Sequence, residues 1–211
     1  MTRSGSLLAR VYGPGARWYD ALSGEFVYRA GRLAGIDLLG LREGDAVLDL
    51  GCGTGLNLPE LVRRVGPTGR IVALDRSADM LAVAERRAQR LGWSNVTLVH
   101  ADATGFGPRD LADGPVDAVL ATYAMSVFPD ADAAWRNARS VLRPGGRACI
   151  VDMQPPTGVA RLLSPVAHLA AAAGGADLGA RPWQLLERDG SRIVRRTLRG
   201  GHIVAVAGSV G

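Results

Sequence analysis

The sequence predicts an α/β fold in which helices cover both faces of a mostly parallel sheet. From Ala46 onward, short apolar runs alternate with segments of helical periodicity. Runs such as Val116–Thr122 are apolar on both faces, which is typical of strands buried in a parallel sheet. Turn-forming residues such as Gly66-Pro67-Thr68-Gly69 separate the segments. At 211 residues, we expect one main domain with short additions.

The expected elements follow one another in a regular order. We expect strands at 46–50, 70–74, 96–99, 116–122 and 147–152. We expect helices at 56–65, 79–91 and 131–142. Ser77 is the expected N-cap of the second helix and Gly92 its end. We expect residues 143–146 to form a turn, and residues 192–198 and 202–207 to pair as a β-hairpin.

Two segments lie outside this alternation. Residues 1–40 carry aromatic side chains in a polar setting, and we expect short helices there that form an N-terminal cap or lid. Residues 41–211 would form the ligand-binding domain. Within it, residues 155–190 are expected to be a variable insertion on the substrate side, with an alanine-rich helix at 159–173 and a short helix after Pro182.

Composition excludes several classes of protein. The formal net charge is +5, but the arginines are scattered and aromatic residues make up 5% of the chain, so we expect no nucleic-acid partner. The arginine content reflects compositional bias or, alternatively, a basic surface for peripheral contact with anionic lipids. Cys52 and Cys149 fall in different elements, which indicates a reducing compartment. With no apolar signal region and no long uncharged apolar stretch, we expect a cytoplasmic protein without a transmembrane helix.

Three glycines directly follow the first expected strand, at Gly51, Gly53 and Gly55. Glycines at this position allow tight turns and close approach of a ligand, which usually indicates a nucleotide. Their spacing differs from the Gly-x-Gly-x-x-Gly of dinucleotide enzymes, and no lysine follows them as in a P-loop. Asp49 would repel a pyrophosphate but suits a cation. S-adenosylmethionine carries an ammonium and a sulfonium, and a charge-assisted bond to it is worth roughly 1.5–3 kcal/mol.

Two further acidic residues follow the next expected strands. Asp75 lies about 20 residues beyond the glycines, where a carboxylate accepts the ribose hydroxyls. Its alternative role as an N-cap is filled better by Ser77. Asp102 is placed to accept the adenine amino group or, alternatively, is a turn residue. Met80 packs against the adenine or ribose, or else belongs to the core.

In this order, the motifs resemble those of class I S-adenosylmethionine-dependent methyltransferases. The matching segments are 47–55, 72–77, Asp102 and 142–146, so the resemblance covers about residues 44–153. It implies a Rossmann-like sheet of seven strands, the last of them antiparallel. The candidate cofactor-binding residues are Asp49, Gly51, Cys52, Gly53, Gly55, Asp75, Arg76, Met80, Asp102, Ala103 and Thr122.

The segments 53–59 and 75–81 further resemble ubiquinone/menaquinone methyltransferases and bacterial phospholipid N-methyltransferases. This resemblance implies methyl transfer to a small molecule or lipid, such as a natural product or a phospholipid head-group amine. A quinone-pathway C-methyltransferase is the alternative, and a non-catalytic S-adenosylmethionine-binding partner protein is an alternative of another class. Residues 121–126 lack the Asp/Asn-Pro-Pro-aromatic motif of enzymes that methylate DNA bases.

Methyl transfer from a sulfonium chiefly requires proximity and orientation, so catalytic residues are hard to infer. Tyr123 is the first candidate near the methyl group, where it orients the acceptor or only supports the cofactor. His168 is the candidate base if the acceptor must lose a proton. Tyr12, Trp18 and Tyr19 join Tyr123 as candidate substrate residues. The three histidines suggest no metal triad, and the sequence shows no recognisable Asp/Asn/His cluster, so we expect no metal.

Overall fold

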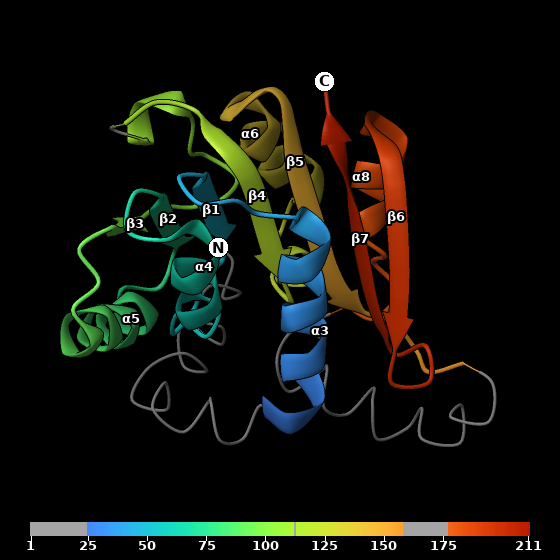
Figure 1. Ribbon diagram of the computed structural model, residues 1–211. Helices are drawn as coiled ribbons and strands as arrows, with labels where there is room; N and C mark the ends of the chain where they lie inside the picture. Colours follow the sequence, from blue (N-terminus) through green and yellow to red (C-terminus); the bar gives the residue numbers. More distant parts are fainter. Residues whose placement is uncertain (1–24, 112, 158–176) are drawn as a thin grey trace, which may run out of the picture.

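A computed structural model describes residues 25–111, 113–157 and 177–211 of the chain (Figure 1). In these residues, seven strands form one sheet in the order β3-β2-β1-β4-β5-β7-β6. The strands are β1 (Ala46–Leu50), β2 (Arg70–Asp75), β3 (Val96–His100), β4 (Val116–Thr122), β5 (Leu142–Met153), β6 (Gly190–Leu198) and β7 (Ile203–Val210). Strands β1 to β5 run parallel, and β7 pairs antiparallel with both β5 and β6. The predicted fold class is confirmed, including the antiparallel last strand and the terminal hairpin.

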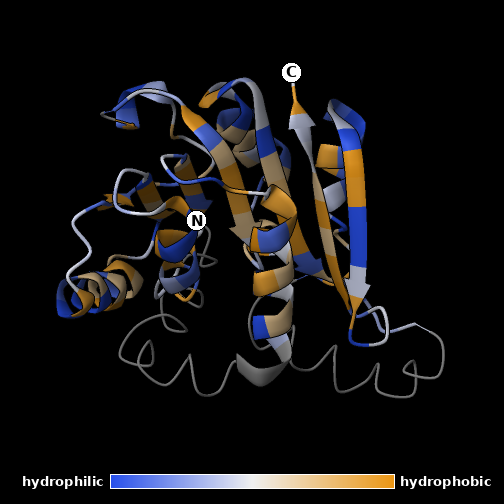
Figure 2. Cartoon of the chain, in the orientation of Figure 1, coloured by the Kyte–Doolittle hydropathy of each residue, from blue (hydrophilic) through white to orange (hydrophobic). Residues whose placement is uncertain are grey.

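Helices cover both faces of the sheet. They are α3 (Glu25–Leu39), α4 (Leu58–Val65), α5 (Ala78–Leu91), α6 (Ala131–Ser140) and α8 (Trp183–Asp189). Side chains of α3, α4 and α5 form one buried cluster with one face of the sheet, and side chains of α6 and α8 form a second cluster with the other face. Figure 2 shows both hydrophobic and hydrophilic residues along these helices, as expected for helices that pack one side on a sheet.

The two faces can be followed residue by residue along β1. Successive side chains of a strand point to opposite faces. Val47 belongs to the cluster of α3, α4 and α5, whereas Leu48 and Leu50 belong to that of α6 and α8. Asp49 therefore points to the face that α3 and α4 cover. The strand order reverses between β1 and β4, and ligands of open α/β sheets bind at the carboxyl ends of strands beside such a reversal.

Most of the predicted boundaries agree with the structure, and one turn does not. Helix α5 has Ser77 as its N-cap and ends at Gly92 in the left-handed conformation, as predicted. The expected turn at residues 143–146 lies instead within β5. The pairing with β4 shifts from Val116 opposite Leu142 to Ala118 opposite Arg147, so these residues form a bulge. Sequence reasoning missed this because the pairing of Leu142 depends on a partner strand.

The segments outside the regular alternation are described only in part. Of the expected N-terminal cap, the structure describes α3, a 15-residue helix whose Ile36 and Leu39 are buried against the sheet. The short helix expected after Pro182 is α8. The expected helix at 159–173 lies outside the described residues. Among the residues described, no helix is both long and apolar enough to cross a membrane.

Candidate cofactor site

The three glycines form a tight loop between β1 and α4. Gly51, Gly53 and Gly55 have φ values of 72°, 54° and 77°, which disfavour any residue with a side chain. A Cβ at Gly51 would lie 2.5 Å from the Cβ of Ala124, so close packing also requires glycine there. A Cβ at Gly53 would meet no described atom within 4 Å. Gly53, unlike Gly51, therefore lies beside unoccupied space, into which a side chain at this position would project.

Asp49 lies fully buried at the base of this loop. Its Oδ1 accepts a hydrogen bond of 2.9 Å from Nδ2 of Asn57, and the same amide nitrogen lies 3.0 Å from the Thr122 hydroxyl. Asn57, the residue just before α4, thus links the ends of β1 and β4. Within the described part of the chain, Oδ2 of Asp49 and Oδ1 of Asn57 have no hydrogen-bond partner. These two buried acceptor atoms can bind a ligand group that carries several N–H donors, such as an ammonium.

The protonation of Asp49 depends on this environment. Burial raises the pKa of Asp49 to about 7, and the negative charge of Asp75 acts in the same direction. The hydrogen bond from Asn57 and the positive charge of Arg32 oppose the rise in pKa. A cation bound at Asp49 would favour the ionised carboxylate further. Near neutral pH, Asp49 in the free site is therefore partly protonated, and a positive ligand would shift it toward the carboxylate.

Asp75, at the end of β2, faces the glycine loop. Its Oδ2 accepts a hydrogen bond of 2.8 Å from the Gly53 amide, and its Oδ1 accepts one of 2.8 Å from the Ser77 amide. Ser77 itself caps α5 by accepting from the Met80 amide, so Asp75 is not the N-cap. Each carboxylate oxygen can accept more than one hydrogen bond, so both remain able to receive hydroxyl groups. The geometry is compatible with the predicted ribose role.

The residues expected near an adenine lie at the ends of β3 and the start of α5. Asp102 is exposed, and its Oδ1 accepts hydrogen bonds from the Thr104 amide and hydroxyl, which lower the pKa of Asp102. It therefore shapes the turn, while its exposure leaves it accessible to a ligand. Met80 and Ala103 are buried, with 4% of each exposed, and Arg76 is exposed. Burial of Met80 is compatible with both of its predicted roles, in the core and beside the ligand.

Tyr123 directly follows β4 in a rare left-handed conformation, with φ of 56°. Its hydroxyl donates a hydrogen bond of 2.9 Å to the carbonyl of Tyr28, and the two rings lie 5.0 Å apart. A Cβ at Gly31 would collide with the Tyr123 hydroxyl, so α3 packs closely on this ring. The hydroxyl is thus directed toward α3, and the ring remains the part of Tyr123 suited to a role near the methyl group.

Some predicted site residues cannot be placed. Tyr12, Trp18, Tyr19 and His168 lie outside the described residues. Cys52 is buried in the loop, and burial raises the pKa of its thiol. In the part of the chain that the structure describes, no three His, Cys, Asp or Glu side chains are grouped so as to hold a metal ion.

Sequence reasoning missed three polar groups near this edge of the sheet. Asn57 carries no local signal beyond its place after the glycines. Arg32 is 7% exposed and lies on the buried stripe of α3, which an arginine four residues before Ile36 could have indicated. Asp152, at the end of β5, is fully buried and accepts hydrogen bonds from the Ser126 hydroxyl and amide; burial raises the pKa of Asp152 to about 6.

Together, the fold and the loop define an α/β protein with a nucleotide-type site that places a buried carboxylate at the base of its glycine loop. The sequence matches the methyltransferase-domain family over residues 41–177, and the chain belongs to this family. The match includes the glycine loop and the strands β1 to β5. The resemblance inferred from the sequence is thereby confirmed.

Individual relatives agree with this membership. A ubiquinone/menaquinone biosynthesis C-methyltransferase UbiE from Hahella chejuensis is 32% identical over 161 residues, which are 74% of this chain and 64% of the relative. An arsenite methyltransferase from Aquipseudomonas alcaligenes is 34% identical over 117 residues, which are 54% of this chain and 34% of the relative. The chain thus spans about one third to just under two thirds of the length of these relatives.

Solved structures share the fold. A methyltransferase from Aquifex aeolicus described as dependent on S-adenosylmethionine superposes with a TM-score of 0.65 at 20% identity, over 97% of both chains. A phosphoethanolamine N-methyltransferase from Haemonchus contortus, in complex with S-adenosylmethionine, has a TM-score of 0.70 at 16% identity, over 93% of this chain and 56% of that one. At these identities the likeness concerns the fold.

Proposed function

We propose that the protein binds S-adenosylmethionine and transfers its methyl group to a small molecule or a lipid. The observation that carries the proposal is the buried Asp49 beside the glycine loop: it is hydrogen-bonded to Asn57, and each of these two side chains keeps one buried oxygen without a partner among the described residues. These two acceptors suit the ammonium of the cofactor, whereas a pyrophosphate would meet a negative charge. Asp75 would accept the ribose hydroxyls, and Asp102, Met80 and Ala103 would surround the adenine.

When bound, the cofactor supplies an electrophilic methyl group on a positively charged sulfur. The acceptor donates an electron pair to the methyl carbon, and the electrons of the carbon–sulfur bond return to sulfur, which leaves as a neutral thioether. The contribution of this chain is to hold the cofactor in one orientation and to place the acceptor in line. His168 stays the candidate base, and Tyr12, Trp18 and Tyr19 stay candidates for contact with the acceptor.

Among acceptors, a quinone-type ring carbon is supported by the UbiE relatives, and an amine of a natural product or phospholipid head group fits the same cofactor site. Arsenite is disfavoured. The sequence holds two cysteines, both buried, and burial raises the pKa of Cys149 to about 12, so neither offers a thiolate to a soft metalloid.

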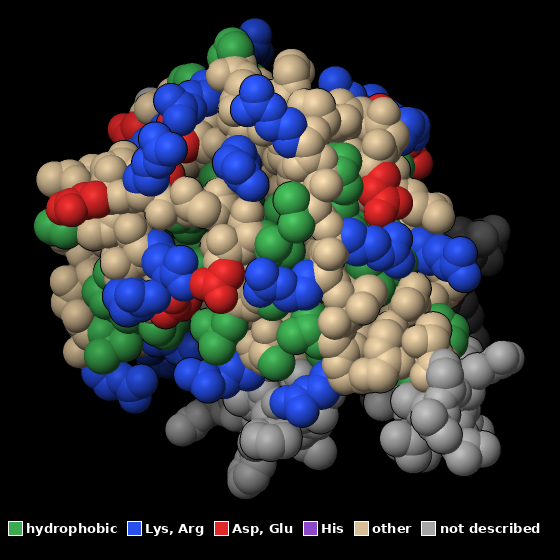
Figure 3. Space-filling model, turned by 45° about the vertical axis from the view of Figure 1, so that its right-hand side comes forward, with side chains coloured by type: hydrophobic (Ala, Val, Ile, Leu, Met, Phe, Trp, Pro, Cys, Tyr) green, Lys and Arg blue, Asp and Glu red, His purple; other side chains and the backbone are tan. Residues whose placement is uncertain are grey.

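Contact with a membrane surface is a finer part of this proposal. Figure 3 shows arginine side chains spread over the visible face among hydrophobic and uncharged groups, without one continuous basic patch. On this face, dispersed arginines favour a solvated surface over a dedicated lipid-binding one. We propose first a cytoplasmic protein that acts on a freely diffusing acceptor, with peripheral contact to a membrane as the alternative.

Transfer of a radiolabelled methyl group tests the activity. The purified protein is incubated with labelled S-adenosylmethionine and, separately, with a demethylated quinol, phosphatidylethanolamine vesicles and phosphoethanolamine. We expect label in one of the organic acceptors. A co-crystal that contains the demethylated cofactor, together with no transfer to any acceptor, would favour a non-catalytic binding protein instead.

Substitution of Gly53 by alanine should weaken cofactor binding more than it weakens the fold. The new methyl group would enter the open space beside the loop, so we expect the affinity for S-adenosylhomocysteine to fall at least about tenfold, with a loss of stability of about 1 kcal/mol from the left-handed backbone. The matched control Gly51→Ala should lose about 1–3 kcal/mol, because its Cβ meets Ala124. Calorimetry and urea denaturation measure the two effects. Unchanged affinity in G53A would place the ligand elsewhere.

Substitution of Tyr123 by phenylalanine separates the hydroxyl from the ring. Loss of the bond to the Tyr28 carbonyl should lower the free energy of unfolding by about 1 kcal/mol. Because the ring remains, we expect the rate of methyl transfer to stay within about twofold, whereas Tyr123→Ala should reduce it strongly. A loss of more than about tenfold in Y123F would instead assign the hydroxyl a direct role toward the acceptor.

A further inference from the structure

His202 lies at the carboxyl end of β5, on the turn that leads into β7. Ile203, the first residue of β7, pairs with Met153, the last residue of β5. The Gln154 amide, one residue further on, donates a hydrogen bond of 2.9 Å to the His202 carbonyl. Figure 1 shows the turn between β6 and β7 at the end of the sheet to which the arrows of β4 and β5 point. His202 therefore lies at the same edge of the parallel strands as the glycine loop after β1.

The ring of His202 has one nitrogen held by the backbone and one nitrogen without a partner. Nδ1 lies 2.6 Å from the carbonyl oxygen of Gln154. Because a carbonyl oxygen can only accept a hydrogen bond, Nδ1 carries the proton of the neutral ring. Nε2 then holds the lone pair, and among the described residues it has no hydrogen-bond partner. A neutral histidine fixed in this tautomer is prepared to accept a proton at Nε2.

The burial and the position of His202 both point to a ligand. Its exposed fraction is 9%, and polar atoms of side chains buried to this extent are normally hydrogen-bonded. Strand β7 is the second strand from β4, and neighbouring strands lie about 4.8 Å apart, so His202 lies roughly 10 Å to the side of the end of β4. Tyr123, the candidate residue near the methyl group, directly follows β4. A small acceptor above β5 is therefore within reach of both Tyr123 and His202.

We infer that His202 is the general base that takes a proton from the methyl acceptor. The inference rests on the proposed function and assigns to it acceptors that carry an acidic hydroxyl or an ammonium. The proton passes from the acceptor to Nε2, and the electron pair that it leaves forms the new bond to the methyl carbon as the carbon–sulfur bond breaks and its electrons stay on sulfur. The proton then passes from the imidazolium to water. The Gln154 carbonyl stabilises the imidazolium, because Nδ1 continues to donate to it.

Asparagine is the matched replacement for His202. Its amide nitrogen takes the place of Nδ1 and can still donate to the Gln154 carbonyl, but nothing replaces the lone pair of Nε2. Transfer of labelled methyl groups is measured at saturating S-adenosylmethionine with the quinol, phosphatidylethanolamine and phosphoethanolamine, each of which must lose a proton. His202→Asn should lower the rate about 100-fold or more, while the affinity for S-adenosylhomocysteine stays within about twofold. Thr157→Val, which removes a side-chain hydrogen bond to the Gly200 carbonyl of the same turn, should leave both unchanged.

Three results would overturn the inference. The first is a rate in H202N within about threefold of that of the natural protein, and the second is a loss of rate in His168→Asn but not in H202N, which would assign the proton to His168. The third needs no variant: nitrogen-15 NMR of the natural protein at pH 8 should show the proton of the neutral ring on Nδ1, and a proton on Nε2 would exclude the proposed base. If the natural protein transferred no label to any acceptor, the proposed function itself would fail, and the inference with it.

Discussion

Replacing Asp49 by asparagine is expected to stabilise the free protein at pH 8 and to remove most of its affinity for the cofactor. The side chain is fully buried, and burial raises the pKa of Asp49 from 3.8 to about 7. Ionisation of Asp49 therefore destabilises the folded state, on the order of 4 kcal/mol at most. Asparagine keeps an acceptor for the Asn57 amide and removes the charge, so we expect a gain of about 1–3 kcal/mol.

The stability difference between D49N and the natural protein should increase with pH. Between pH 4 and pH 7 the folded protein holds the Asp49 proton more tightly than the unfolded chain does, so the stability contributed by this group falls as pH rises. The difference between D49N and the natural protein should be near zero at pH 4 and largest at pH 8. Asp152 also has a raised pKa, but it is present in both proteins and cancels in the comparison.

The affinity of the natural protein for its ligand should rise with pH, whereas its stability falls. The ionised carboxylate attracts the ammonium, so the affinity of the natural protein for S-adenosylhomocysteine should rise between pH 6 and pH 8. At pH 8, D49N should bind about 10- to 100-fold more weakly, which corresponds to a lost charge-assisted bond. Urea denaturation and calorimetry at several pH values measure both effects. A variant that bound as tightly as the natural protein would show that Asp49 does not contact the ligand.

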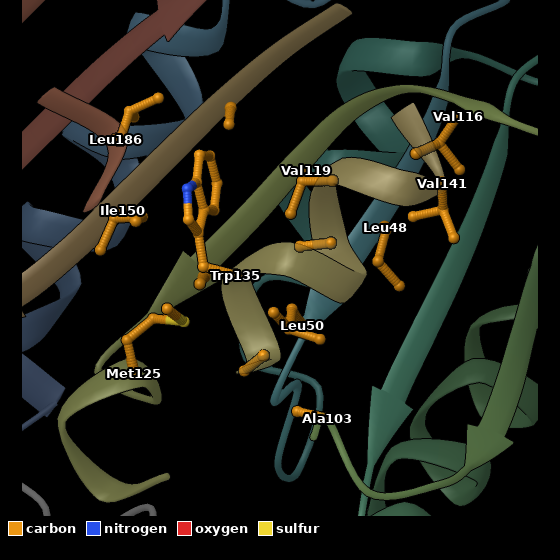
Figure 4. Close-up of a cluster of buried hydrophobic side chains, with 14 of the residues drawn as sticks. Leu48, Leu50, Ala103, Val116, Val119, Met125, Trp135, Val141, Ile150 and Leu186 are labelled. Carbon is orange, nitrogen blue, oxygen red and sulfur yellow. The ribbon is translucent and has the colours of Figure 1, made fainter. Parts of the chain in front are cut away.

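Replacing Trp135 by alanine is expected to have the largest effect on stability, about 3–5 kcal/mol. Trp135 is 2% exposed and lies between α6 and the sheet, close to Ile150 and Leu186 (Figure 4). Its Nε1 also donates a hydrogen bond of 2.8 Å to Asp189. Alanine would leave a cavity and remove this bond, so the fold loses both packing and a polar contact.

Phenylalanine provides the matched control for Trp135. It keeps most of the apolar ring and loses the hydrogen bond, and Arg139 continues to donate to Asp189. We expect W135F to lose about 1–2 kcal/mol in urea denaturation. Since Trp135 packs on the face opposite Asp49, W135F should retain its affinity for S-adenosylhomocysteine. A loss below about 1 kcal/mol in W135A would mean that this cluster contributes little to stability.

Local sequence features predicted the parts of the site that depend on neighbouring residues. The glycines after β1 have positive φ values, which the tight local turn requires. Ser77 caps α5 by accepting a hydrogen bond from Met80 in the first turn of that helix. Asp49 could be singled out because its charge and its position before Gly51 are visible in the sequence. Its burial and raised pKa, in contrast, arise from neighbours that only the fold provides.

The features that sequence reasoning missed depend on distant parts of the chain. Asn57 becomes a link between β1 and β4 only when Thr122 lies beside it. The spacing of Arg32 and Ile36 could indicate that Arg32 is buried, but its electrostatic influence on Asp49 arises only because α3 packs on the sheet face to which Asp49 points. The hydroxyl of Tyr123 bonds to Tyr28, 95 residues away in the sequence, and this turns it toward α3.

The most direct test of the account is to compare two ligands on the natural protein by calorimetry at pH 8. A site with a buried carboxylate at its glycine loop should bind S-adenosylhomocysteine and give no measurable binding of NAD. Tight binding of NAD together with no binding of S-adenosylhomocysteine would contradict the account, because the loop would then accept a pyrophosphate in spite of Asp49.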